Sequence, residues 1–210
     1  MTSTASQSTL QQYEPVDIAF VVESTYPYLR GGLSAVVHDI VLANPDKKIG
    51  IIHITWDRNS LHEDAYGIPP NVLWVFPVYL SMDEHSDDFR ALGPSALRTS
   101  THGRQTLVKL FFNALQTAMD CREYSQLWRL YDEGVNPRTR NYNLWALMST
   151  REFLIESRER LSDLDISLTN LFWLLREFFS LACAVLGPDY PYANIYHSHT
   201  TGYAGLASAA

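Results

Sequence analysis

Residues 16–40 constrain the fold more than any other part of the sequence. They open with VDIAFVV, a short apolar run rich in β-branched residues, which is typical of a strand buried on both faces. Gly31-Gly32 then precedes LSAVVHDIVLA, whose apolar residues recur at helical spacing. The order of strand, glycine turn and helix predicts the first unit of a doubly wound α/β domain.

The start of this predicted helix suits a bound anion such as phosphate. The first backbone N–H groups of a helix have no partner within it, and the positive end of the helix dipole lies there. The alternative is that Gly31-Gly32 only lets the chain turn tightly against the strand. The glycines alone leave both interpretations open.

Three further apolar runs predict strands of the same parallel sheet. They are IGIIHITWD (residues 49–57), VLWVFPVY (residues 72–79) and ANIYHSH (residues 193–199). Between the last two runs, the pattern is helical almost throughout, over a stretch too long for an ordinary connection. The sequence therefore predicts a tail at residues 1–15 and a Rossmann-like domain at 16–210, with a large helical insertion at about 90–187.

Two of the helices predicted within this insertion can be given residue ranges. WALMSTREFLIESRERL is expected to form one continuous helix, residues 145–161. The stretch at 166–187 is apolar enough to suggest a membrane span, but Arg176 and Glu177 lie at its middle, where a bilayer is least tolerant of charge. We therefore expect it to be a buried helix at the centre of the helical region.

Charge and cysteine content exclude several classes of function. The net charge of −7 argues against non-specific nucleic-acid binding, because no basic stripe can displace counterions. Cys121 and Cys183 form no CxxC pair or zinc spacing, which predicts buried reduced thiols, no metal site and a cytoplasmic protein. No Walker A lysine, GxSxG elbow or HExxH motif occurs.

His197 and His199 come where a predicted parallel strand ends, which is the edge where α/β proteins bind ligands. Residues two apart on a strand face the same side, so both rings can point at one ligand. The alternatives are a hydrogen-bonded structural histidine or a chance pair. A zinc site is disfavoured, since no third ligand occurs at a spacing typical of zinc sites.

Four more side chains near the glycine turn suit a sugar phosphate, and each has a structural alternative. They are Glu23, Tyr26, Tyr28 and Arg30. A carboxylate can bind a sugar hydroxyl or cap the following turn, aromatic rings can stack on a sugar or pack internally, and arginine suits a phosphate. Asp57 could hold a ribose, but the glycine pattern of a dinucleotide site is absent, so an NAD-dependent oxidoreductase is a weak alternative.

Two stretches resemble a known family. STYPYLRGGLSAVVHDI and HSHTTGYAG are similar to segments of family 4 glycosyltransferases of the GT-B fold, and in particular of PelF-like exopolysaccharide glycosyltransferases, with an N-terminal domain of the DUF3492 type. Their glycine loop has the form EGTYPYxxGGVSSWVH; Ser24, Leu33 and Ala35-Val36 are mild departures. The resemblance covers roughly residues 16–79 and 192–210.

This resemblance implies an enzyme that transfers a hexose from a nucleotide sugar, UDP-glucose, to a growing exopolysaccharide, with no metal or cofactor. The residues implied at the donor phosphate and sugar are Gly31, Gly32, Leu33 and Arg30, and those on the acceptor side are Glu23, Tyr26 and Tyr28. One histidine lies beside the donor sugar in this family. We place His199 ahead of His197, although the PelF-like pattern YHxxxTGYAG retains only the first.

The resemblance also implies partners. A second Rossmann-like domain that binds the donor nucleotide is missing from the sequence, so we expect this chain alone to transfer no sugar. The other implied partners are the nucleotide sugar, the polysaccharide acceptor and an inner-membrane polysaccharide export complex, which would bring a cytoplasmic protein to the membrane. The alternative is a non-catalytic α/β module whose helices, residues 107–186, form a partner-binding surface.

Overall fold

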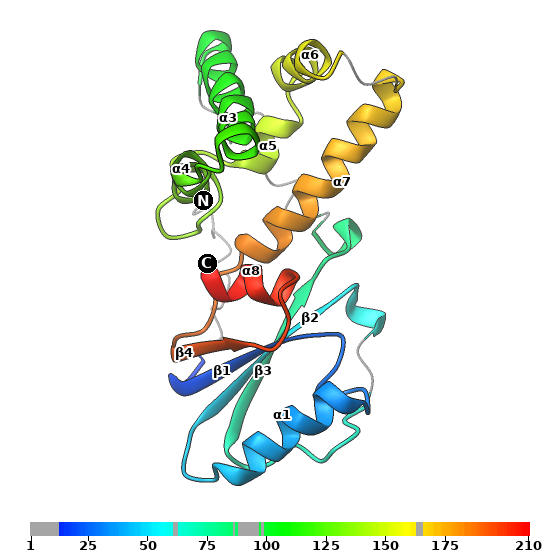
Figure 1. Ribbon diagram of the computed structural model, residues 1–210, viewed down its shortest axis with the longest axis vertical. Helices are drawn as coiled ribbons and strands as arrows, with labels where there is room; N and C mark the ends of the chain where they lie inside the picture. Colours follow the sequence, from blue (N-terminus) through cyan, green and yellow to red (C-terminus); the bar gives the residue numbers. More distant parts are fainter. Residues whose placement is uncertain (1–12, 61–62, 86, 88–96, 98, 163–165) are drawn as a thin grey trace, which may run out of the picture.

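The computed structural model describes residues 13–60, 63–85, 87, 97, 99–162 and 166–210. Four strands form one parallel sheet in the order β3-β2-β1-β4 (Figure 1). The strands are β1 (Val16–Glu23), β2 (Ile49–Thr55), β3 (Val72–Tyr79) and β4 (Ala193–Ser198). The predicted α/β fold with a Rossmann-like parallel sheet is therefore confirmed.

The central strands β1 and β2 are apolar because most of their residues are buried between the two faces of the sheet. Every residue of β2 is buried, as its unbroken apolar run predicts. β1 pairs with β2 on one side and with β4 on the other, so Phe20 lies opposite His197 and Val21 opposite Ser198. Because all strands are parallel, the carboxyl ends of β1 and β4 meet at the same edge of the sheet.

Helices cover the two faces unequally. On one face, α1 (Gly32–Ala43) buries Val37 and Val41 completely in a cluster that includes Phe20 of β1. On the other face, α8 (Tyr203–Ala209) and the C-terminal part of α7 (Leu168–Leu186) pack on the sheet through a cluster that includes Ala204 and Val185. β1 is thus held between two helical layers.

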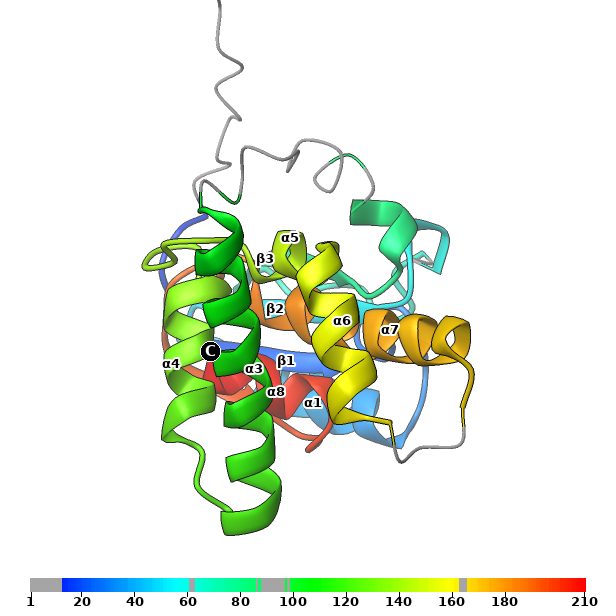
Figure 2. The ribbon, with the colours of Figure 1, turned by 90° about the horizontal axis from the view of Figure 1, so that it is seen from above.

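A helical region lies between β3 and β4 in the chain and on the α8 side of the sheet (Figures 1 and 2). Its described helices before α7 are α3 (Thr101–Cys121), α4 (Ser125–Gly134), α5 (Leu144–Met148) and α6 (Arg151–Arg160). It has a core of its own, in which Phe111 packs against Phe112, Phe153 and Phe179. Short 3-10 turns at Arg58–Ser60 and Met82–His85 follow β2 and β3.

The single helix predicted at residues 145–161 is wrong, because the chain breaks between α5 and α6. Thr150 stands at the break in an extended conformation, and its hydroxyl accepts a hydrogen bond from the backbone N–H of Phe153. A threonine that caps a new helix in this way interrupts the old one.

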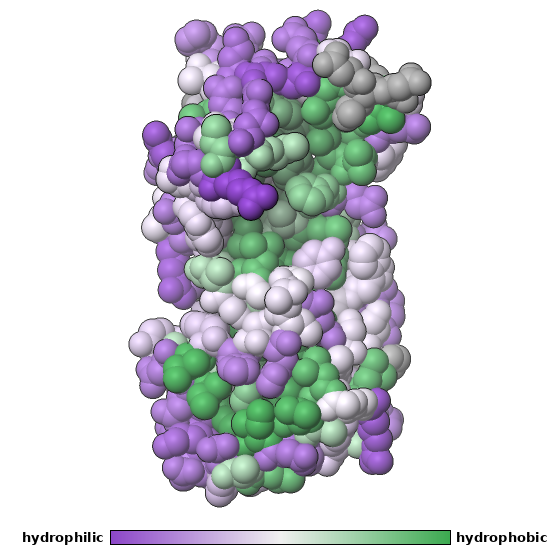
Figure 3. All heavy atoms as spheres, viewed as in Figure 1, coloured by the Kyte–Doolittle hydropathy of each residue, from purple (hydrophilic) through white to green (hydrophobic). Residues whose placement is uncertain are grey.

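The prediction that α7 is a buried central helix is also wrong. Only 28% of the window Thr169–Leu186 is buried, although it is long and apolar enough to cross a membrane by length and composition. One side packs on α5, α8 and β3, whereas Trp173, Leu174 and Phe178 are more than half exposed. Figure 3 shows apolar surface in this part of the molecule, between the ribbon positions of α3 and α7.

The two cysteines differ from the prediction of buried thiols. Both are free, but Cys121 is exposed, because it ends α3 beyond Ala118, the last buried residue of that helix. Cys183 is half-buried in α7, and burial raises the pKa of its thiol.

Candidate functional site

The glycine turn leads from β1 into α1. Gly31 is the N-cap residue in an extended conformation, with φ −176° and ψ 172°, and Gly32 begins the helix. Neither glycine has a positive φ, and a Cβ added at either would meet nothing within 4 Å. Neither a tight turn nor a close protein neighbour therefore requires glycine here. The open space is compatible with the close approach of a ligand to the backbone.

The first turn of α1 has no internal cap. Gly31 offers no side chain to cap it, and the first turn contains no acidic residue. The N–H of Gly31 donates to the hydroxyl of Tyr66 over 3.3 Å. The N–H groups of Gly32 and Leu33 form no hydrogen bond with any described residue. Of the backbone N–H groups of Gly31, Gly32 and Leu33, the last two thus remain available to an anion.

Tyr66 was missed by the sequence analysis. It lies in the β2–β3 connection, where the carboxylate of Asp64 accepts hydrogen bonds from the N–H groups of Tyr66, Gly67 and Ile68. This loop also contacts the glycine turn through Arg30, because Nε of Arg30 donates to the carbonyl of Ala65 over 3.1 Å. The sequence Asp-Ala-Tyr-Gly (residues 64–67) could have predicted this turn, since an aspartate followed closely by glycine is typical of a turn stabilised by the aspartate side chain.

The two tyrosines before the turn are packed against histidines. Tyr26 is fully buried, with its hydroxyl 3.4 Å from Nδ1 of His38, and burial raises its pKa to about 12. A ring without exposed surface cannot stack on a sugar in this conformation, so the geometry favours the packing role for Tyr26. Tyr28 is half-buried, and its ring lies edge-on to His53 at 4.8 Å between centroids.

Glu23 joins the end of β1 to the start of α8. Its Oε1 accepts hydrogen bonds from the N–H of Ala204 over 2.7 Å and from the hydroxyl of Thr200 over 3.2 Å. A Cβ at Gly202 would come within 2.9 Å of the same oxygen. The geometry therefore favours the capping role for Glu23, although the capped helix is α8 and not α1.

His197 and His199 lie on the sheet face that α1 covers. Both rings contact Phe20, at centroid distances of 5.5 and 5.9 Å, and they lie 4.6 Å from each other. This agrees with the expectation that they face the same side. His197 is exposed, whereas His199, just after the end of β4, is half-buried.

His199 has an unusual environment. Its Nε2 atom is buried and has no hydrogen-bond partner among the described residues. Burial, and then the neighbouring His197, lower the pKa of His199 below its ordinary value. The lowered pKa favours the neutral imidazole, which carries an unused hydrogen-bonding atom, and this is uncommon for a buried polar group.

Asp57, which the sequence offered as a residue that could hold a ribose, has a structural role. Asp57 accepts hydrogen bonds from the N–H and the hydroxyl of Ser60, so its carboxylate stabilises the 3-10 turn after β2. Within the described ranges, no three histidine, cysteine or acidic side chains are grouped so that they could hold a metal ion.

These features define a Rossmann-like α/β domain with a candidate site where β1 and β4 end. The model of the family described as a domain of unknown function, DUF3492, matches residues 16–210, and the chain belongs to this family. The family is associated with the N-terminal regions of glycosyltransferases. No curated protein and no solved structure matches the chain.

Proposed function

We propose that this chain is the N-terminal part of a glycosyltransferase that transfers a hexose from a nucleotide sugar, UDP-glucose, to a growing exopolysaccharide. The observation that carries the proposal is the unpartnered Nε2 of His199 at the sheet edge where the chain also enters the uncapped helix α1. Ligands of doubly wound proteins bind at this edge. Membership of a glycosyltransferase-associated family supports the class of reaction.

The glycine turn would bind the departing nucleotide diphosphate. The N–H groups of Gly32 and Leu33, at the positive end of α1, would donate to phosphate oxygens as negative charge develops. Arg30 is exposed, and its bond to Ala65 uses only Nε, so its terminal nitrogens can reach a phosphate. Charge stabilisation of this kind proceeds without a metal ion.

His199 would act beside the donor sugar. As a neutral imidazole in a partly desolvated position, it can hydrogen-bond a sugar hydroxyl or the leaving phosphate through Nε2. His197 packs against it and remains the second candidate for this role. The half-buried Tyr28 would lie toward the acceptor, and Glu23 would hold the His199 turn in place.

The remaining partners are part of the same proposal. A second Rossmann-like domain would supply the binding site for the nucleotide, and the acceptor would be a growing polysaccharide. The protein would work in the cytoplasm and reach the inner membrane through an export complex.

The experiment uses the complete protein encoded by the reading frame to which this chain belongs. Transfer from UDP-glucose is measured as UDP release that depends on an added polysaccharide acceptor. Gly32→Val places a branched side chain over the N–H groups that would bind phosphate, and we expect it to abolish transfer while the melting temperature stays unchanged. Ala43→Val, at the exposed far end of the same helix, is the control and should transfer normally. Normal turnover by Gly32→Val would contradict the proposed role of the turn.

One observation favours the alternative of an interaction module. Trp173, Leu174 and Phe178 expose their apolar side chains on one side of α7. The same assay separates the two functions, because an interaction module releases no UDP from any nucleotide sugar.

A further inference from the structure

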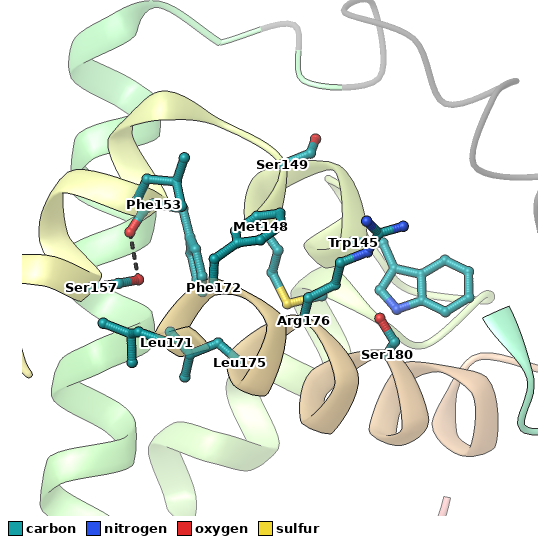
Figure 4. A pocket seen from close by; sticks show the side chains of 11 residues that line it. Trp145, Met148, Ser149, Phe153, Ser157, Leu171, Phe172, Leu175, Arg176 and Ser180 are labelled. Carbon is teal, nitrogen blue, oxygen red and sulfur yellow. Dashed lines mark hydrogen bonds between the residues drawn. The ribbon is translucent and has the colours of Figure 1, made fainter. Parts of the chain in front are cut away.

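A cavity of about 180 Å³ lies among α5, α6 and α7, away from the strand ends that carry the candidate site (Figure 4). Most of its lining is apolar: Met148, Phe153, Leu171, Phe172 and Leu175. An apolar cavity of about 150 Å³ is large enough to bind benzene. The space in this chain is therefore sufficient for a body of about six to eight carbon atoms.

Polar side chains gather at one end of the cavity. Figure 4 shows Ser180 and Arg176 on the side of the Trp145 indole, whereas Phe153, Leu171 and Leu175 lie on the opposite side. Arg176 and Ser180 are four residues apart on α7, so they share one face of that helix. The cavity thus has a polar end and an apolar end.

Ser180 is 1% exposed, and its Oγ atom has no hydrogen-bond partner in the part of the chain that the structure describes. The other deeply buried serine in the lining, Ser157, differs because its hydroxyl donates to the carbonyl of Phe153 over 2.6 Å. A buried hydroxyl without a partner is costly. A ligand atom that accepts a hydrogen bond from Ser180 would remove this cost.

Arg176 brings a positive charge to the same end. Its guanidinium carbon lies 5.1 Å from the ring centroid of Trp173, and it forms no ion pair with any described residue. Its side chain is exposed, so it stands at the mouth of the cavity. A guanidinium binds a carboxylate through two parallel hydrogen bonds.

We propose that this cavity is a binding site for a small monocarboxylate with an apolar body of about six to eight carbons. The carboxylate binds to Arg176 and accepts a hydrogen bond from Ser180. The apolar body extends along α7 toward Leu175 and Leu171. This site is independent of the proposed sugar transfer, because none of its residues belongs to the sheet edge.

The probe is octanoate, titrated into the folded chain by calorimetry. A second readout is the indole N–H signal of Trp145 in a ¹⁵N-labelled sample, assigned with Trp145→Phe, because that ring lines the cavity. We expect saturable binding that shifts the Trp145 signal. Octan-1-ol, which has the same body without the charge, should bind at least about tenfold more weakly, because an ionic hydrogen bond is lost.

The variants distinguish specific binding in this cavity from a general affinity of the protein for fatty anions. Arg176→Gln should weaken octanoate binding about tenfold and leave octan-1-ol binding unchanged, and Ser180→Ala should weaken octanoate about threefold. Arg158→Gln is the matched control, since Arg158 is exposed on α6 and does not line the cavity. The proposal is overturned if octanoate leaves the Trp145 signal unmoved, if octan-1-ol binds equally well, or if both arginine variants behave alike.

Discussion

The carboxylate of Glu23 accepts a 2.7 Å hydrogen bond from the backbone N–H of Ala204, which ties the end of β1 to the first turn of α8. The same oxygen accepts from the hydroxyl of Thr200, the residue after His199. This pairing fixes the turn that carries His199 against β1. Of the two roles that the sequence left open for Glu23, binding a sugar hydroxyl or capping a turn, these contacts favour the second.

Removal of this charge should loosen the turn. Glu23→Gln keeps the size of the side chain but loses the charged acceptor, so we expect the free energy of unfolding to fall by about 1 kcal/mol. Urea unfolding measures the change. Glu63→Gln, at an exposed glutamate outside the turn, should leave stability unchanged. Equal stability of the two variants would show that Glu23 does not hold the turn.

Two glycines should differ in how much alanine destabilises the fold. A Cβ at Gly50 would lie 2.2 Å from ring carbons of Trp74, so Gly50→Ala should cost about 1–3 kcal/mol or more through overpacking. Gly31→Ala should change stability by less than about 0.5 kcal/mol, since its backbone is extended and nothing lies within 4 Å. Thermal unfolding of both variants tests the contrast, and a large loss at Gly31 would contradict the open geometry of the turn.

Stability should depend on pH through a buried histidine. His53 is 1% exposed and donates from Nδ1 to the carbonyl of Tyr26 over 3.0 Å. Burial lowers its pKa below the ordinary value of 6.5, an effect that the bond to Tyr26 only partly offsets. Below pH 6.5 the unfolded chain therefore binds a proton that the folded chain does not, and the free energy of unfolding falls as the pH falls.

The loss should level off once the pH drops below the folded pKa of His53. His199 contributes in the same direction, because its pKa is also lowered. Urea unfolding between pH 5 and 7.5 measures the slope, which His53→Asn should reduce because an amide can donate to Tyr26 without titrating. An unchanged slope in that variant would assign the pH dependence to other groups.

The sheet was predictable from the sequence because each strand follows one of the apolar runs, although only β1 and β2 are buried along most of their length. All four strands lie within one or two residues of those runs. The helical region was harder, since α7 has apolar residues on all sides and the pattern does not reveal which side packs. The break at Thr150 depends on one capping hydroxyl, which a periodicity of apolar residues does not register.

The site was predictable only in outline. The run at residues 193–199 was expected to join the same parallel sheet, and its observed pairing with β1 brings His199 to the edge of the sheet that receives the glycine turn. The partners of Glu23 and Tyr26 were not predictable, because they come from segments far away in the chain, at Ala204 and His38. Sequence patterns identify a polar residue at a strand end, whereas its role depends on which distant backbone group it meets.

The most direct test of the proposed function is the turnover of His199→Ala in the complete protein, with UDP-glucose and an acceptor. If Nε2 of His199 hydrogen-bonds the donor in the transition state, kcat should fall by about 10²-fold or more while the melting temperature changes little. His102→Ala, at an exposed histidine of α3, should leave both quantities unchanged. Near-normal kcat in a His199→Ala protein with a lowered melting temperature would show that the histidine is structural and would contradict the proposed site.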